Sequence, residues 1–346
     1  MEMLKAMDFR SDTVTRPTAA MREAMASAPV GDDVYGDDPT VNSLQEYAAE
    51  LLGMESGIYA CSGTMGNLMA VMAHCGRGEG VLMGTASHTW KNEGGNIANI
   101  AGLMPYPLDD GDGIPAIDAI RAAFQPSGDV HYAHTTLLLL ENTHNASGGI
   151  PIPVDTFAAV CSAAREMGLR VHVDGARLFN AAVYFGVNAR RYTELVDSVQ
   201  ICLSKGLGAP MGSLLCGKRD FVERAKYMRK RLGGGQRQVG IAAAAGLIAL
   251  RDMRARLSED HANAALLAQG LEKAGVDVEN VAHRTNMVFF RLPQGLDGED
   301  FAARCAARGL LLKPVSPGRV RMVTHLDVDE ADVRSAVAVV EEVLRR

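Results

Sequence analysis

The chain has 346 residues, of which 47% are hydrophobic and 22% are charged, and its formal net charge at pH 7 is −6. These values are ordinary for a globular protein of one large or two medium-sized domains, and a chain of this length can bury most of its apolar surface. The negative net charge argues against nucleic acid or an anionic membrane as partner, because both select basic surfaces.

Six cysteines are scattered along the chain, and none forms a CxxC pair or stands at metal-site spacing with histidine. Free thiols of this kind are typical of a reducing cytosol, so we expect a cytoplasmic protein without a metal site. The first ten residues include two acids and no apolar core, unlike a signal peptide. The most apolar stretch, Gly240 to Leu250, is shorter than the ~20 residues that cross a bilayer, so we predict a buried helix there.

Short apolar runs alternate with helix-length segments through the first two-thirds of the chain. Four of them are typical of buried parallel strands: Thr136–Leu140, Leu169–Val173, Val199–Leu203 and Ser213–Cys216. Val154–Met167 has helical spacing and stops at Gly168, a frequent C-cap residue. This β-α-β order predicts an α/β domain with a mostly parallel sheet over residues 1–250.

The alternation weakens after residue 250, and we expect a smaller C-terminal α+β domain over residues 251–346. Its predicted elements are a long charged helix at Arg251–Ala274, a strand at Met287–Leu292, a helix at Gly298–Ala307, a strand at Val320–Val323 and a helix at Ala331–Arg346.

Three of the predicted strands end in residues that can carry chemistry, namely Glu141, Asp174 and Lys205. In open α/β sheets, ligands bind at the carboxyl ends of the strands. Asp174 lies three residues before Arg177 in HVDGAR, and Lys205 lies in the glycine-rich segment SKGLGAPMGS. Taken alone, Lys205 is better explained as a solvated charge in a loop whose glycines form turns.

A third segment, CSGTMGN, follows a short apolar run at Gly57–Tyr59 and precedes a predicted helix at Leu68–His74. Its small polar residues offer amides and hydroxyls to a phosphate at a helix N-terminus, although a plain helix cap explains them as well. Together the three segments meet the needs of a pyridoxal phosphate (PLP) site. Gly63 and Thr64 suit the phosphate, Asp174 the ring nitrogen, and Lys205 the aldehyde.

Six segments in the same order resemble the signatures of the L-threonine aldolases, a family of fold-type-I PLP enzymes. They are DFRSDTVTRPT, GDDVYGDDPTVN, LENTHN, HVDGAR, CLSKGLG and RVRMVTH, and they span nearly the whole chain. The resemblance implies a PLP-transferase-like large domain with a seven-stranded, mostly parallel sheet and a small C-terminal domain. It also implies a carbon–carbon lyase that cleaves L-threonine, L-allo-threonine and other β-hydroxy-α-amino acids to glycine and an aldehyde.

The resemblance implies a catalytic set made of a Schiff-base lysine, a histidine stacked on the cofactor ring, a second histidine near the substrate hydroxyl and an acid at the ring nitrogen: Lys205, His88, His131 and Asp174. Further cofactor contacts are implied for Ser62, Gly63, Thr64, Arg177 and Ser204, and across a subunit interface for Tyr35 and Arg237. The implied substrate-carboxylate residues are Ser11, Arg177 and Arg321. The implied assembly is a homo-oligomer, a dimer of dimers, with shared active sites.

The chain departs from the family pattern at Asn92, where many relatives carry an aromatic residue; Trp90, two residues earlier, is a candidate to fill part of that space. We interpret Glu141 and His144 as hydrogen-bonding residues that support the fold, and the basic run 229–231 as a solvated helix face. His88, His131 and a bound water all remain candidates for the catalytic base.

Two alternative functions stay open. Another fold-type-I PLP enzyme, either a β-eliminating lyase or an aminotransferase, uses the same lysine and aspartate logic. A non-catalytic nucleotide-binding α/β protein is the other alternative. The chain has neither GxxxxGK[ST] nor a GxGxxG after its first strand, which disfavours it.

Overall fold

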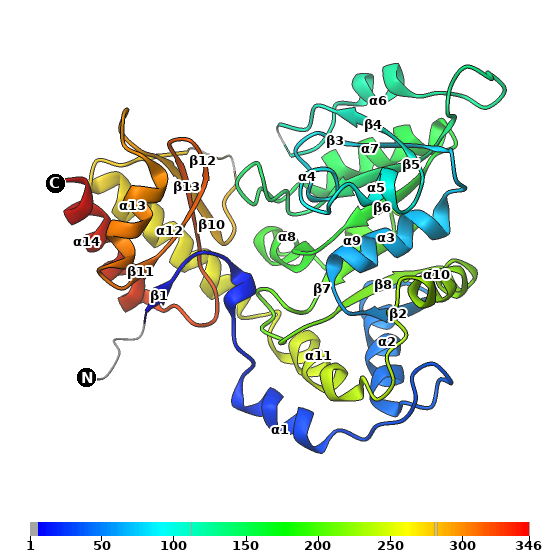
Figure 1. The fold of residues 1–346 in the computed structure, drawn as a ribbon, viewed down its shortest axis with the longest axis horizontal. Helices are drawn as coiled ribbons and strands as arrows, with labels where there is room; N and C mark the ends of the chain where they lie inside the picture. Colours follow the sequence, from blue (N-terminus) through cyan, green and yellow to red (C-terminus); the bar gives the residue numbers. More distant parts are fainter. Residues whose placement is uncertain (1–5, 112, 280, 282, 346) are drawn as a thin grey trace.

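The computed structural model describes residues 6–111, 113–279, 281 and 283–345, which form a larger and a smaller lobe (Figure 1). The larger lobe is built on one seven-stranded sheet. Its strands lie in the order β2 (Ser56–Ala60), β8 (Ser213–Gly217), β7 (Ser198–Cys202), β6 (Arg170–Asp174), β5 (Thr135–Glu141), β3 (Gly80–Gly84) and β4 (Met104–Leu108). The four apolar runs expected to be strands are therefore β5, β6, β7 and β8.

One strand runs against the others. β8 pairs antiparallel with both β2 and β7, and the remaining neighbours are parallel. The prediction of a parallel strand at Ser213–Cys216 is therefore wrong in direction. Only ten residues, 203–212, join β7 to β8, which is too short for the crossover that a parallel pair needs. The prediction of a mostly parallel, seven-stranded sheet is confirmed.

Helices cover both faces of this sheet. Side chains alternate across a strand, and in β5 Leu138 and Leu140 belong to one buried cluster while Leu137 and Leu139 belong to another. The first face is covered by α2 (Pro39–Leu52), α7 (Val154–Glu166), α8 (Leu178–Phe185), α9 (Arg190–Thr193) and α11 (Gly240–Asp252); the second by α3 (Gly63–His74), α5 (Asn96–Asn99) and α10 (Arg219–Arg231). Shorter or more peripheral elements are η1 (Asp12–Val14), α1 (Ala19–Ser27), α4 (His88–Lys91) and α6 (Ile117–Ala123).

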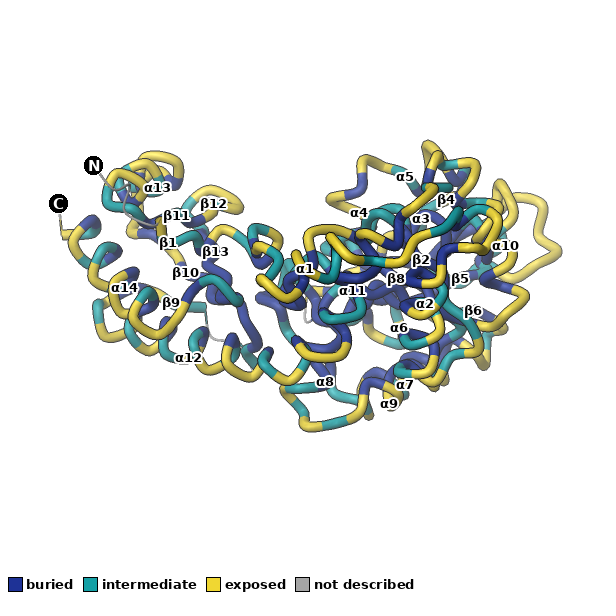
Figure 2. Tube along the Cα trace, turned by 90° about the horizontal axis from the view of Figure 1, so that it is seen from below, coloured by how far each residue is buried: buried dark blue, intermediate teal, exposed yellow. Residues whose placement is uncertain are grey.

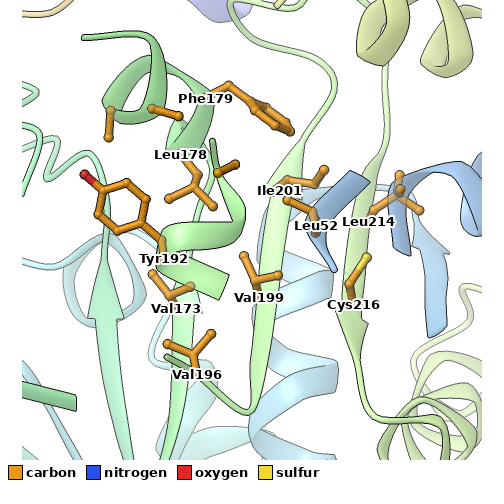
Figure 3. Close-up of a cluster of buried hydrophobic side chains, with 14 of the residues drawn as sticks. Leu52, Val173, Leu178, Phe179, Tyr192, Val196, Val199, Ile201, Leu214 and Cys216 are labelled. Atoms are coloured by element: carbon orange, nitrogen blue, oxygen red, sulfur yellow. The ribbon is translucent and has the colours of Figure 1, made fainter. Parts of the chain in front are cut away.

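The largest core cluster holds β7 between β8 and β6 in the interior of the sheet. Val199 and Ile201 of β7 and Leu214 of β8 are fully buried against Leu178 and Tyr192 (Figure 3). Dark-blue, buried stretches gather in the middle of the larger lobe, whereas the loops and the outer turns of many helices are yellow (Figure 2). Because β7 cannot shift within this core, the backbone that leads to Lys205, three residues beyond the end of β7, is held in place.

Two predicted helices of the larger lobe are confirmed. α7 ends as expected before Gly168, whose φ of +77° lets the chain turn while its N–H donates to Arg165 O at 2.9 Å. The apolar stretch Gly240–Leu250 forms α11. In the described part of the chain, no helix is long and apolar enough to cross a membrane.

The smaller lobe has a four-stranded sheet in the order β12 (Lys313–Ser316), β13 (Arg319–Val323), β10 (Met287–Arg291) and β9 (Asp277–Val278), with helices α12 (Leu257–Lys273), α13 (Gly298–Ala306) and α14 (Glu330–Leu344). The predicted strands and helices beyond residue 287 are confirmed within one or two residues; Arg346 lies outside the described residues. The N-terminal β1 (Met7–Asp8) pairs with β11 (Leu310–Leu311), and Phe9 is buried in this lobe's core.

The predicted long helix at Arg251–Ala274 is confirmed from Leu257 to Lys273, but its predicted start is wrong, because Arg251 and Asp252 belong to the preceding helix. α11 ends at Asp252 and α12 begins at Leu257. No glycine or proline marks the break. It follows from packing, since Met253 and Leu257 are both buried in the larger lobe's core while α12 continues into the smaller lobe.

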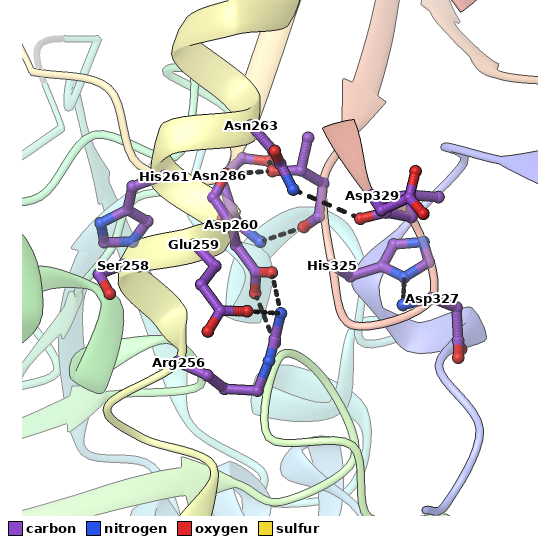
Figure 4. Close-up of polar contacts among 12 residues, drawn as sticks. Arg256, Ser258, Glu259, Asp260, His261, Asn263, Asn286, His325, Asp327 and Asp329 are labelled. Atoms are coloured by element: carbon purple, nitrogen blue, oxygen red, sulfur yellow. Dashed lines mark hydrogen bonds and ion pairs between the residues drawn. The ribbon is translucent and has the colours of Figure 1, made fainter. Parts of the chain in front are cut away.

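A buried polar cluster ties α12 to the strands that carry the smaller lobe's site residues (Figure 4). Asp260 has no solvent exposure and accepts from both Arg256 terminal nitrogens, at 2.7 and 3.2 Å. Burial raises the pKa of Asp260 to about 6, although Arg256 opposes the shift. Thr324, directly after β13, donates to Asp260 O at 2.6 Å and its own carbonyl accepts from Asn286. These bonds hold the end of β13, which also carries Arg321.

Candidate active site

Two adjoining cavities open at the carboxyl ends of β5, β6 and β7, where the N-terminal segment passes between the two lobes. The inner cavity has a volume of about 190 Å³ and the outer one about 620 Å³, and both are lined by His88 and Lys205. The inner cavity is also lined by Ser62, Gly63, Thr64, Asn67, Glu93, Asp174, Gln200 and Ser204. The outer cavity is also lined by Ser11, Asn92, Asn145, Arg177, Lys313, Arg319 and Arg321.

The floor of the inner cavity is the N-terminus of α3. Ser62 is its N-cap and accepts a hydrogen bond from Met65 N at 3.2 Å. A Cβ added to Gly63 would lie 2.8 Å from Cys202 Sγ, so only glycine fits against the sheet here. The free amides of a twelve-residue helix face the cavity beside Thr64, which is the arrangement that binds a phosphate.

Asp174 lies at the end of β6 and is 3% exposed. Its Oδ1 accepts from Ala176 N at 3.0 Å, and its Oδ2 accepts from Asn67 Nδ2 at 2.8 Å. Both carboxylate oxygens are thus oriented by hydrogen-bond donors of the protein, one in the backbone after β6 and one in the Asn67 side chain on α3. The carboxyl group is held in one position on the wall of the inner cavity, as the acid facing a ring nitrogen must be.

A buried chain of hydrogen bonds orients Asn67 in turn. Its Oδ1 lies 3.2 Å from His172 Nε2, and His172 Nδ1 lies 2.8 Å from Ser198 Oγ. Because an amide oxygen only accepts, His172 Nε2 carries the proton and Nδ1 accepts from Ser198. Burial lowers the pKa of His172 to about 4, so the ring is neutral at pH 7. The tautomer of His172 therefore sets the direction of the Asn67 amide.

His88 forms a buried pair with Glu93, a residue that the sequence did not single out. His88 Nδ1 lies 2.9 Å from Glu93 Oε1, and the same oxygen accepts from Asn67 Nδ2 at 2.9 Å. The bond to Glu93 raises the pKa of His88, while burial raises the pKa of Glu93. The pair keeps the His88 proton on Nδ1 and leaves Nε2 as the ring's other reactive atom.

The His88, Glu93 and Asp174 side chains lie close enough to suggest a metal site, since one ligand atom of each lies within 4.8 Å of the others. The Asn67 amide nitrogen, however, donates to both carboxylates. N–H groups therefore fill the space between the two acids, and a cation there would face hydrogen atoms instead of lone pairs.

Arg177 lines the outer cavity and is 8% exposed. Its Nε and Nη2 donate to Asp12 at 2.7 and 2.6 Å, forming a two-bond fork. Burial raises the pKa of Asp12, but the charges of Arg177, Lys205 and Arg321 outweigh it and hold that pKa well below its usual range. Asp12 is a second residue that the sequence did not reveal.

Arg321 is buried without an acidic partner. Its Nη1 donates to Asn145 Oδ1 and its Nη2 to Arg10 O, both at 3.0 Å, and its buried Nε has no hydrogen-bond partner among the described residues. Burial, together with the charge of Arg177, lowers the pKa of Arg321 to about 10. Because Arg321 also lines the outer cavity, its guanidinium offers an uncompensated positive charge to a carboxylate bound there.

The structure brings together ten of the predicted site residues around these cavities: Ser11, Ser62, Gly63, Thr64, His88, Asp174, Arg177, Ser204, Lys205 and Arg321. It leaves three outside. His131 has an 81% exposed side chain whose ring contacts Asp129, in the loop after α6 (Figure 1). Tyr35 is 78% exposed, and Arg237 pairs with Asp32 at 3.0 Å.

Other sequence interpretations have mixed outcomes. Glu141 supports the fold as expected, accepting from His88 N and Asn145 N, and His144 bonds Asp110. Arg229 is wrongly assigned to a solvated face, because it is 3% exposed and pairs with Asp33 at 2.8 Å. Asn92 lines the outer cavity, whereas Trp90 is absent from its wall and 38% exposed. Among the described residues, therefore, Trp90 does not replace the missing aromatic.

Comparison with known proteins identifies relatives over nearly the full length. Residues 8–293 match the family model described as beta-eliminating lyase. The low specificity L-threonine aldolase of Escherichia coli K12 is 49% identical, over 96% of this chain and 97% of that protein. Low-specificity L-threonine aldolase 1 of Arabidopsis thaliana is 42% identical, over 99% and 97%. The structure of Leishmania major threonine aldolase superposes with a TM-score of 0.83 at 20% identity, over 97% and 99%.

The His88–Glu93 pair generates a direct prediction about proton affinity. Replacing Glu93→Gln removes the negative charge at His88 Nδ1, so the pKa of His88 should fall and its ring should lose its proton at lower pH. The measurement is an NMR titration of isotope-labelled histidine, with Glu55→Gln as control. A His88 midpoint that stays in place or moves to higher pH in Glu93→Gln contradicts the assignment.

Proposed function

We propose that this chain, which belongs to the beta-eliminating lyase family and within it to the low-specificity L-threonine aldolases, uses PLP to cleave L-threonine, L-allo-threonine and similar β-hydroxy-α-amino acids to glycine and an aldehyde. The observation that carries the proposal is that Lys205 and Arg321 line the same cavity, and that neither forms an ion pair with an acid among the described residues. A lysine for an aldehyde and an arginine for a carboxylate are what a PLP enzyme for amino acids requires.

The residues of the inner cavity fit PLP. The N-terminus of α3 with Ser62, Gly63 and Thr64 suits the phosphate, Asp174 suits the ring nitrogen, and His88 forms part of the wall. Lys205, with Ser204 beside it, lies at the border of the two cavities and can reach the aldehyde carbon. When bound, PLP supplies an electron sink for the electrons released as the bond at the substrate Cα breaks.

The outer cavity orients the amino acid. Arg321 binds the substrate carboxylate through its guanidinium group, which lines the cavity without an acidic partner, and Ser11 and Arg177 line the same cavity. Arg177 has two of its nitrogens committed to Asp12, so it acts mainly by positive charge and through its remaining nitrogen. Holding the carboxylate at one point limits which bond at Cα stands perpendicular to the cofactor ring, and that choice selects the reaction.

His88 is the base that we favour, because it lines both cavities and carries its Nδ1 proton toward Glu93. In its neutral form Nε2 can accept the proton of the β-hydroxyl, directly or through one water. A positioned base of this kind contributes ~10²–10⁴-fold to the rate. His131 acts only if its exposed loop moves or faces the site of another subunit.

We also propose a homo-oligomer, a dimer of dimers, in which Tyr35 and Arg237 complete the phosphate site of a neighbouring subunit. The two residues lie on loops that contact each other, since Asp33 N donates to Arg237 O at 3.2 Å, and Tyr35 projects into solvent. Tyrosine is enriched at protein–protein interfaces relative to the rest of the protein surface, which supports this placement. The six free cysteines further support a cytoplasmic location.

The reaction itself is tested by its products. The PLP-loaded protein should convert L-threonine to glycine and acetaldehyde in a 1:1 ratio, without 2-oxobutyrate and ammonia. Borohydride reduction followed by peptide mapping should find the pyridoxyl group on Lys205. Lys205→Ala should be inactive, whereas Lys218→Ala on the exposed surface should retain full activity. Formation of 2-oxobutyrate as the main product would establish the eliminating lyase instead.

Sharing of sites is tested by mixing two defective variants, Lys205→Ala and Arg237→Ala. If Arg237 serves the neighbour's site, random exchange places one intact site in each mixed dimer, so activity should recover to about a quarter of wild type. Exchange is verified by mass spectrometry of differently tagged subunits. Complete exchange without recovery above the two separate variants rules the shared site out.

A further inference from the structure

The outer cavity holds more positive charge than its proposed chemistry uses. Six cationic side chains line it, and no aspartate or glutamate among the described residues does: Lys91, Arg177, Lys205, Lys313, Arg319 and Arg321. Two of the six are neutralised from behind. Asp12 binds Arg177, and Glu279 binds Arg319 through bonds of 2.7 and 2.8 Å.

The proposed function accounts for two more of these cations. Lys205 serves the cofactor aldehyde, and Arg321 serves the α-carboxylate that every amino-acid substrate carries. Lys91 and Lys313 remain; both are exposed at the cavity, and neither side chain has a hydrogen bond or ion pair to a described residue. Two lysines without an acidic partner therefore line the cavity, and each of the other four cations has an acidic partner or a proposed ligand.

The position of Lys313 places it beside the carboxylate site. In the antiparallel pair β12–β13, Lys313 lies directly opposite Arg321. Side chains of directly opposed residues project from the same face about 5 Å apart, and two like charges there are destabilising. Partial burial, together with the charge of Arg321, lowers the pKa of Lys313. Such an arrangement is relieved when an anion lies between the two side chains.

Lys91 approaches the same space from the larger lobe. It is the last residue of α4, three residues after His88, and it lines the outer cavity on the His88 side. The substrate carbon that bears the hydroxyl must face His88. A substituent on that carbon therefore extends into the outer cavity, which Lys91, Asn92 and Lys313 all line.

We propose that Lys313 and Lys91 form a second anion subsite, and that the preferred substrates are β-hydroxy-α-amino acids whose side chain carries its own carboxylate, as in 3-hydroxyaspartate. This inference rests on the proposed function and narrows its substrate class. It also explains why the pocket accepts a like-charge pair across two strands, because a substrate with two carboxylates supplies one to Arg321 and the other to Lys313.

The reaction on such a substrate balances without any further reagent. The Cα–Cβ bond of 3-hydroxyaspartate breaks, the hydroxyl proton passes to the base, and a C=O bond forms at Cβ. Cα takes up one proton, so the products are glycine and glyoxylate. No oxidant or reductant is required, and the leaving aldehyde retains the carboxylate that the two lysines bind.

The test compares kcat/KM for the 3-hydroxyaspartate diastereomers with kcat/KM for L-threonine in the PLP-loaded protein, measured by glycine release. The wild type should favour the better 3-hydroxyaspartate diastereomer at least tenfold. Lys313→Gln should lower the ratio of the two kcat/KM values about tenfold, mainly through KM, which corresponds to the loss of one charge-assisted contact. Lys91→Gln should lower it in the same direction, Lys313→Arg should restore it, and the surface variant Lys218→Gln should not change it.

Salt provides a second readout. Because a charge–charge contact near a cavity mouth is screened, kcat/KM for 3-hydroxyaspartate should fall more steeply with sodium chloride than that for threonine. If threonine is cleaved but the wild type shows no preference, or if the ratio is unchanged in Lys313→Gln and Lys91→Gln, the subsite is refuted and the aldolase proposal stands. If neither substrate is cleaved, both proposals are overturned together.

Discussion

The buried ion pair between Arg177 and Asp12 holds the site together. Asp12 comes from the N-terminal segment, Arg177 from the loop after β6, and Asn286 of the smaller lobe donates to the same carboxylate at 3.3 Å. Three parts of the chain that are remote in sequence thus meet at one carboxylate with no solvent exposure. Removing one partner of such a pair leaves an uncompensated buried charge and costs roughly 3–5 kcal/mol. The N-terminal segment is therefore fixed across the seam of the two lobes.

This pair also sets the electrostatics of the cavity. One aspartate lies among three cations, Arg177, Lys205 and Arg321, and it can neutralise only one of them. Arg321 remains buried and unpaired, at the cost of a lowered pKa, and the cavity keeps a positive potential that attracts anions. The inner cavity has the opposite character, because Asp174 and Glu93 lie there with His88. The two cavities share Lys205 and His88, but carboxylates line only the inner one, so the proposed pyridine ring and the proposed substrate carboxylate have distinct surroundings.

Much of this arrangement could be predicted from the sequence. The features that could not be predicted share a physical reason: they depend on contacts that form only when the chain folds. Buried parallel strands are continuous apolar runs. The sequence therefore predicted β5, β6 and β7 and the residues at their ends. An apolar run carries no direction, so β8 was assigned the wrong one. The break between α11 and α12 has no glycine or proline to mark it. Glu93, Asn67 and Asp12 are ordinary polar residues until the fold brings them to His88, Asp174 and Arg177. Tyr35, Arg237 and His131 lie away from the two cavities of this chain, so the roles predicted for them stay predictions that rest on the proposed contacts with other subunits.

The central claim is that the unpaired guanidinium of Arg321 binds the carboxylate of an amino acid. The most direct measurement is the affinity of the PLP-loaded protein for glycine, by calorimetric titration, because glycine has a carboxylate and no side chain. Arg321→Gln should weaken glycine binding at least tenfold while PLP is retained, since a buried charge pair is lost. Arg334→Gln, on the exposed face of α14, should not alter it. Glycine binding of wild-type strength in Arg321→Gln would contradict the account.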